Sequence, residues 1–225
     1  MKRSLILFLL LCGVPAFAQS NPKAALRQQT FGVYSSYNSA EEIKFDTSDL
    51  VVFTNGYKIT REEFLFSFYS ASPDDSSNAR KSAYLDKYIV SYKRAFEAMD
   101  QGLDTTTKFQ LDYLTHKQEL ITPFLNEGKT RVEAEALPQV KYALRKYYVD
   151  QLVKALMNKE VWAPQSDAVL QDYFNQHPQY YQGQPFSISR TKVIFDQQRE
   201  KEAELNKKID SKFAFKTNEI LRGKL

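Results

Sequence analysis

The spacing of apolar residues along the chain predicts three long helices. Residues 79–101 and 138–160 each carry an apolar residue every three or four positions, the spacing of a helix that buries one face. A third helix is expected from the Asp104-Thr105-Thr106 cap to Leu125, and Gly102 is well placed to end the helix before it. The predicted inward positions are Leu85, Ile89, Tyr92, Phe96, Met99, Phe109, Tyr113, Leu120, Phe124, Val140, Leu144, Tyr148, Leu152 and Leu156.

Short β patterns stand on either side of these helices. Residues 50–53 are apolar, Asn55-Gly56 is typical of a tight hairpin turn, and residues 57–59 supply the returning strand. Residues 186–195 mix polar and β-branched residues as a strand does, a charged helix is expected over about 197–210, and residues 213–216 predict a last strand. The fold class is therefore expected to be mainly α, with a small β element in which the two ends of the chain pair.

The first 18 residues are typical of a cleavable signal peptide. Lys2 and Arg3 precede an apolar stretch over residues 5–12, and Ala16-Phe17-Ala18 offers the small residues that a signal peptidase reads. Cleavage between Ala18 and Gln19 predicts an exported protein, and the apolar stretch is too short to span a bilayer. Residues 19–49 are rich in Ser, Asn, Gln and Thr without a regular period, so an extended, weakly ordered arm is expected there.

Composition narrows the chemistry that the chain can perform. Of the formal net charge of +4, Lys2 and Arg3 carry two units, so the mature chain offers no basic footprint for nucleic acid. The one cysteine lies in the predicted signal peptide, which excludes a disulfide scaffold and a thiol enzyme. His116 and Glu119 share a helix face as two metal ligands could, but packing explains His116 better. No nucleotide-binding or hydrolase motif is present. We therefore expect no catalytic residues, no metal and no cofactor.

Aromatic residues are the unusual component, with 16 Phe, 14 Tyr and 1 Trp. Tyr92, Phe96, Phe109 and Phe124 are expected in the core. Thr60 and Glu63 form a capping-box pattern before a short helix that is aromatic nearly all round, and so small a domain cannot hide every ring. Rings left at the surface could line a groove that binds unfolded chains. The same rings could instead lie in the core or at a homodimer interface. The candidate peptide-binding residues are Phe66, Tyr69, Tyr84, Tyr88, Tyr147 and Tyr148.

Several motifs occur in the order found in SurA-type periplasmic chaperones, which the chain resembles over about half of its mature length. They are Val51-Val52-Phe53-x-Asn55-Gly56-x-x-Ile59-Thr60-x-x-Glu63-Phe64, Ala98-x-x-x-Gly102-Leu103-Asp104-Thr105, the Tyr113, Leu120 and Pro123-Phe124-Leu125 set, Asp172-Tyr173-Phe174-Asn175-Gln176-His177-Pro178-x-Tyr180-Tyr181, and the end segment from Phe213 to Leu221. The resemblance implies a helical chaperone domain that binds unfolded or nascent envelope and outer-membrane proteins without ATP.

The chain departs from that family where its prolyl isomerase domain would stand. A parvulin-type domain of about a hundred residues is expected after Tyr181, but only residues 182–189 precede the terminal strand region. His116 and His177 lie on different predicted helices and cannot supply the histidine pair of that active site. The alternatives left open are a family member with a degenerate or absent catalytic domain and a structural subunit with one fixed partner. The expected divisions are 1–18 (signal peptide), 19–49 (arm), 50–125 (N-terminal chaperone domain), 126–181 (helical arm and linker helix) and 182–225 (C-terminal segment packing back on the N-terminal domain).

Overall fold

The computed structural model describes residues 22–32, 35–74 and 77–225. Nine α-helices and three strands occur within this part of the chain, and they confirm a mainly α fold with a small β element. The predicted signal peptide and its cleavage site between Ala18 and Gln19 lie outside the described residues. The elements are α1 (Pro22–Phe31), β1 (Asp49–Phe53), β2 (Lys58–Thr60), α2 (Arg61–Ala71), α3 (Asn78–Asp100), α4 (Thr107–Asn126), α5 (Arg131–Ala136), α6 (Pro138–Glu160), α7 (Asp167–Gln176), α8 (Phe186–Lys212), β3 (Phe215–Thr217) and α9 (Glu219–Arg222).

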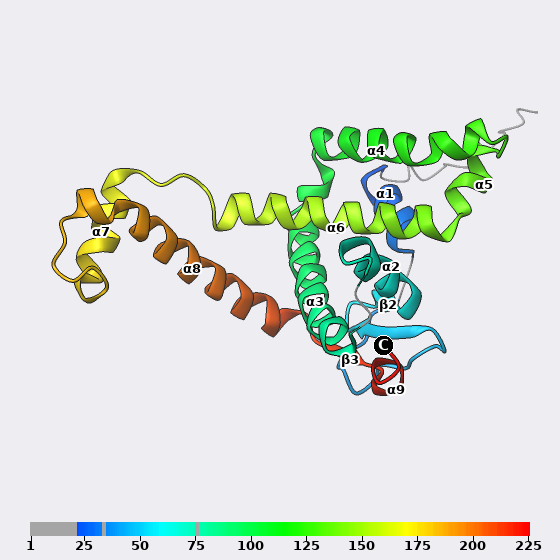
Figure 1. The fold of residues 1–225 in the computed structure, drawn as a ribbon, viewed down its shortest axis with the longest axis horizontal. Coiled ribbons are helices and arrows are strands. Elements are labelled where there is room, and N and C mark those ends of the chain that lie inside the picture. Colours follow the sequence, from blue (N-terminus) through cyan, green and yellow to red (C-terminus); the bar gives the residue numbers. More distant parts are fainter. Residues whose placement is uncertain (1–21, 33–34, 75–76) are drawn as a thin grey trace, which may run out of the picture.

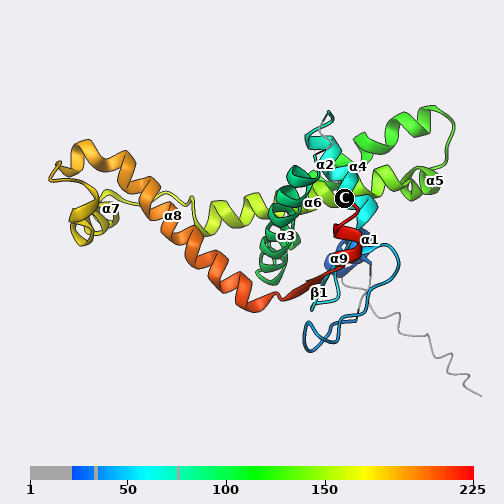
Figure 2. The ribbon, with the colours of Figure 1, turned by 60° about the horizontal axis from the view of Figure 1, so that its bottom comes forward.

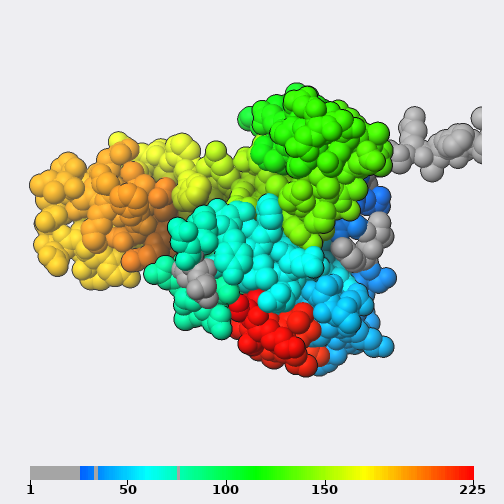
Figure 3. All heavy atoms as spheres, turned by 45° about the vertical axis from the view of Figure 1, so that its right-hand side comes forward, coloured from blue at the N-terminus to red at the C-terminus, as the bar shows by residue number. Residues whose placement is uncertain are grey.

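The sheet pairs the N-terminal hairpin of β1 and β2 with the C-terminal strand β3, as the sequence predicts. β1 lies in the middle and pairs antiparallel with both neighbours, so that Val51 faces Ile59 of β2 and Thr217 of β3. Gly56 takes a positive φ of 86° in the turn before β2, a conformation that glycine adopts without steric cost. In the space-filling view the C-terminal residues (red) lie against the region of β1 and β2 (Figure 3).

The helices form a body around α6 and a projecting arm. α4 lies on one side of α6, and α2 and α3 lie on the other (Figure 1). The predicted core residues Tyr92, Phe96 and Phe109 are buried, and Phe124 is half-buried against the same core. These rings meet mostly edge to face; Phe53 and Phe96, for example, are 5.0 Å apart at 84°. The body therefore has one aromatic core that links the sheet to the helices.

The arm consists of α7 and the N-terminal half of α8, which extend away from the body (Figures 1 and 2). Leu170, Tyr181 and Val193 form a small hydrophobic core there that is separate from the main one. The strand expected over residues 186–195 is wrong, because this segment begins α8. Ser189, Val193 and Gln197 are buried at four-residue spacing, so helical packing prevails over the β-branched composition of the segment.

The extended arm expected over residues 19–49 is also wrong in part, because Pro22–Phe31 forms α1. Phe31 is 1% exposed and lies edge to face against Tyr148 at 5.2 Å. Arg27 of the same helix forms an ion pair with Asp104 at 2.7 Å. Of the described side chains of α1, the apolar residues Leu26 and Phe31 pack in or against the core, and two residues are too few to show a helical period in the sequence.

Candidate functional site

Two of the six aromatic residues proposed to bind peptides lie inside the body. Tyr148 is 0% exposed and Tyr88 is 7% exposed, so neither ring lies on the surface that the peptide-binding prediction requires, and Tyr148 lies inward as its helical spacing predicts. Tyr148 donates a hydrogen bond to Asp104 at 2.7 Å, and Tyr88 lies 5.1 Å from the ring of Tyr92. Both residues stand on the inward stripe of a long helix, where the helical period places them beside core residues.

Two more of the six, Tyr84 and Phe66, belong to the packing between helices, whereas Tyr69 is exposed. The ring of Tyr84 stacks on that of Tyr88 at 5.8 Å, and its hydroxyl is 2.9 Å from that of Ser67. Phe66 lies 5.8 Å from Tyr142, and Tyr69 is 40% exposed at the end of α2. None of these residues lines any of the grooves described below. The structure therefore does not gather the predicted aromatic surface into one site.

An open groove instead runs between α4 and α6, with a volume of about 370 Å³. Leu103, Phe109 and Ala155 supply its apolar lining. Thr106 caps α4 by accepting a hydrogen bond from the backbone N–H of Phe109, which fixes the start of that wall. The short side chain of Ala155 leaves room on the facing wall. The polar lining residues are Thr106, Lys108, Asp112, Gln151, Lys154 and Asn158.

Tyr147, the sixth of the proposed residues, lies next to this groove. It stands one helical turn before Gln151 on α6, and its hydroxyl is 3.5 Å from the carbonyl oxygen of Asp112. Its ring stacks on His116 at 3.9 Å, which accounts for His116 as a packed residue. Burial raises the pKa of Tyr147, and the nearby carboxylate of Asp112 adds to the effect, so its hydroxyl stays neutral. An aromatic pair thus borders the groove.

Among the described residues that line the groove, one cation is unpaired. Lys108 and Asp112 form an exposed ion pair at 2.7 Å, one helical turn apart. The hydrogen bond from Lys108 to Asp112 raises the pKa of the lysine. Lys154 is exposed and forms no ion pair or side-chain hydrogen bond with any residue that the structure describes. The polar residues of the groove therefore carry a net positive charge.

The outward face of α4 carries no charged residue of its own, although Gln118 on this face accepts a hydrogen bond from Arg131 of α5. Leu111 and Leu114 are 59% and 53% exposed. The other positions of this face are Thr107, Thr115, Gln118 and Thr122, which follow the helical period of three and four. Interface cores are depleted of charged residues, so a helix face of this composition fits contact with another polypeptide.

The arm has a second groove, of about 270 Å³, at the junction of α6, α7 and α8. Trp162, Pro164 and Ile194 contribute to its lining, and Trp162 is 47% exposed. Arg190, which also lines it, already pairs with Asp167 at 2.8 Å. This groove offers an apolar surface of the same kind but no unpaired charge of its own.

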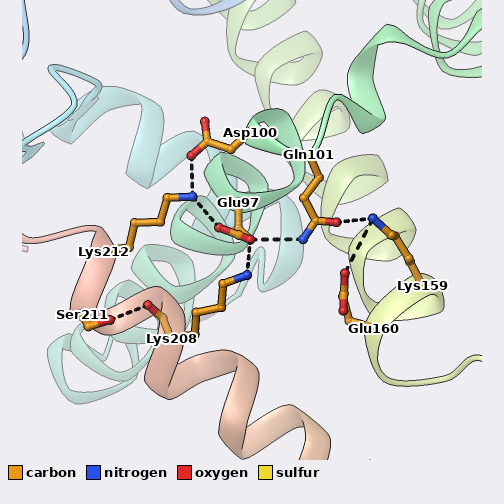
Figure 4. A network of polar contacts seen from close by, with 8 residues as sticks. All are labelled: Glu97, Asp100, Gln101, Lys159, Glu160, Lys208, Ser211 and Lys212. Atoms are coloured by element: carbon orange, nitrogen blue, oxygen red, sulfur yellow. Dashed lines mark hydrogen bonds and ion pairs between the residues drawn. The ribbon is translucent and has the colours of Figure 1, made fainter.

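A cluster of charges holds the arm to the body (Figure 4). Glu97 of α3 is 2% exposed and accepts hydrogen bonds from Lys208 and Lys212 of α8, each at 2.8 Å. Burial alone would raise the pKa of Glu97, but the hydrogen bonds from Lys208, Lys212 and Gln101 outweigh it and lower the pKa to about 2. Lys212 also reaches Asp100 at 2.7 Å. This α3–α8 clamp fixes where α8 leaves the body.

A second buried cluster joins helices inside the body. Glu63 is 1% exposed, and its carboxylate accepts hydrogen bonds from Tyr92 and Arg145. The carboxylate therefore turns inward, and only the Thr60 half of the predicted capping box forms. Burial raises the pKa of Glu63 although Arg145 and Tyr92 oppose the effect. Because none of the grooves described here is lined by this cluster, we assign it to packing.

Neither histidine is part of a metal-binding cluster in the described part of the chain. No group of three or more His, Cys, Asp or Glu residues that could hold a metal ion occurs over residues 22–32, 35–74 and 77–225. His177 stacks on Tyr173 at 4.2 Å, far along the chain from His116. Over the same residues, every helix is too short or too polar to cross a membrane.

Comparison with protein-family models, with curated proteins and with solved structures gives no match. Of the two grooves described above, the α4–α6 groove is the stronger candidate, because it combines an apolar lining with the unpaired cation of Lys154.

Proposed function

We propose that this protein is an ATP-independent chaperone that binds unfolded segments of exported proteins in the groove between α4 and α6. The observation that carries the proposal is an open groove lined by Leu103, Phe109 and Ala155, beside a helix face on which Leu111 and Leu114 are exposed. The sequence pattern of an exported chain and the resemblance to periplasmic chaperones support the same class. The proposed surface differs from the six aromatic residues that the sequence suggested.

The size of the groove implies weak and reversible binding. Burying one apolar side chain contributes about 1.5–3 kcal/mol, whereas association costs roughly 4–15 kcal/mol in lost freedom. A groove of about 370 Å³ holds one or two side chains, so a client must also contact surfaces such as the face of α4. Neutral groups such as Gln151 and Asn158 can bond to the backbone of any sequence. Such a surface tolerates many clients and releases them without an energy source.

The test is suppression of aggregation for unrelated clients. Purified protein is mixed with heat-denatured citrate synthase, reduced insulin and a urea-unfolded outer-membrane β-barrel, and light scattering is followed. The proposal predicts delayed or reduced aggregation of all three at a few-fold molar excess. Protection of only one client would favour a structural subunit with a fixed partner, and protection of none would refute the chaperone assignment.

A further inference from the structure

We propose that the α4–α6 groove selects client segments in which a bulky apolar side chain stands next to a carboxylate. This inference rests on the proposed chaperone function and specifies the clients of the same site. Two features carry it: the apolar lining, including Leu103 and Phe109, and the unpaired ammonium group of Lys154.

The geometry of α6 places the cation and the apolar lining together. Gln151, Lys154, Ala155 and Asn158 are spaced by three, one and three residues, so they share one face of the helix. An apolar side chain that enters the groove contacts this face and the facing wall at Phe109. A carboxylate on a neighbouring client residue then lies within reach of Lys154, which is the charge complementarity that the site offers.

The other charged groups of the groove do not compete for that role. The positive charge of Lys108 is already matched by Asp112 at 2.7 Å, so the pair adds no net charge. A lysine or arginine beside the apolar side chain of a client would meet Lys154 as a like charge and bind less well. The arm groove serves as a contrast, because its Arg190 is paired with Asp167.

The available area favours a transient segment over a second copy of the chain. A helix of 20 residues is about 30 Å long, and a strip about 10 Å wide along it covers roughly 300 Å². Stable interfaces bury about 800 Å² on each partner. By this estimate the face of α4 is by itself too small for a stable dimer interface but sufficient for a short extended segment.

The experiment compares three capped host peptides of Gly and Ser that differ only in the residue after a single Phe, which is Asp, Asn or Lys. Each is titrated into the ¹⁵N-labelled protein and followed by NMR. The amide signals of groove residues such as Phe109 and Ala155 should shift, with the Asp peptide binding about two- to five-fold more tightly than the Asn peptide and the Lys peptide binding weakest. Raising the salt from 20 to 200 mM should reduce the preference.

Two matched variants locate the preference. Lys154→Gln should remove the difference between the Asp and Asn peptides, whereas Lys207→Gln, which removes an exposed charge from α8, should leave it unchanged. Equal affinity for the three peptides, or an Asp preference that survives Lys154→Gln, overturns the inference. If the peptides show no preference while unrelated clients are still protected from aggregation, only this inference fails. If no client is protected, the proposed function fails.

Discussion

Glu97→Gln is predicted to destabilise the attachment of the arm to the body. The substitution keeps the size of the side chain but removes the charge that Lys208 and Lys212 share (Figure 4). Because Glu97 is 2% exposed, its carboxylate depends on these two lysines and on Gln101 for the interactions that replace water. The loss therefore affects the place where α8 meets α3.

The magnitude follows from the pKa of Glu97. Its carboxyl group has a pKa of about 2 in the folded protein against an ordinary value of 4.5, and each pKa unit corresponds to about 1.4 kcal/mol, which gives about 3 kcal/mol in favour of the folded state. The side chains of Lys208 and Lys212 are 61% and 41% exposed, so water and salt screen part of this energy. We expect Glu97→Gln to lower the free energy of unfolding by about 2 kcal/mol at pH 7.

Urea unfolding measures this change with two probes. Circular dichroism reports the helices, and the fluorescence of Trp162, the one tryptophan of the chain, reports the junction between body and arm. Because the folded pKa lies below the unfolded one, the stabilisation by Glu97 is present above pH 4.5 and is lost as the pH falls toward 2. The variant should therefore lose less stability than the wild type over that range. The exposed change Glu204→Gln is the control. An unaltered unfolding midpoint, or a wild-type pH dependence in Glu97→Gln, would show that the ion pairs of Glu97 do not stabilise the fold.

Three further substitutions test the packing of the body and the arm by the same unfolding measurement. Tyr88→Ala should cost about 3–5 kcal/mol, because it removes a ring enclosed by Phe64, Tyr84 and Tyr92; a loss below 1 kcal/mol would place the ring at the surface. Tyr148→Phe should cost about 1.5 kcal/mol by removing the hydrogen bond to the buried carboxylate of Asp104, and an unchanged stability would argue against that bond. Ser189→Ala should raise stability by about 0.5–1 kcal/mol, since the buried hydroxyl of Ser189 has no hydrogen-bond partner among the described residues; a loss of stability would reveal one.

The long helices and the sheet that pairs N-terminal with C-terminal strands could be predicted because each has a clear pattern in the sequence. Leu85, Ile89 and Phe96 recur at helical spacing in α3, and the Asn55-Gly56 turn fixes the hairpin that receives β3. α1 could not be predicted from the few apolar residues that it brings to the core. The start of α8 could not be predicted from the sequence, because its β-branched residues favour a strand locally. The helix forms because it packs Val193 into the small core of the arm.

The candidate site was harder to predict than the fold. The helical spacing places Tyr148 with the inward residues of α6, but Tyr88 lies beside the apolar series of α3, and whether it faces the body depends on how α3 and α6 cross. Tyr147 lies next to the groove since it is one position away from the buried stripe of α6. The groove could have been predicted from two features of the sequence. One is the series of uncharged residues at helical spacing along α4, which includes Leu111 and Leu114, and the other is the small Ala155 on α6.

Site-specific photocrosslinking shows whether unfolded clients bind in the α4–α6 groove. A photoreactive phenylalanine analogue is placed at Gln151, which lines the groove, and in a second variant at Ile220, which is 73% exposed on α9. Each is illuminated with a urea-unfolded outer-membrane β-barrel diluted into buffer. Binding in the groove predicts a covalent adduct with the unfolded client from position 151 and little or none from position 220. Equal adducts from both positions, or none from position 151 while the protein still prevents aggregation, would contradict it.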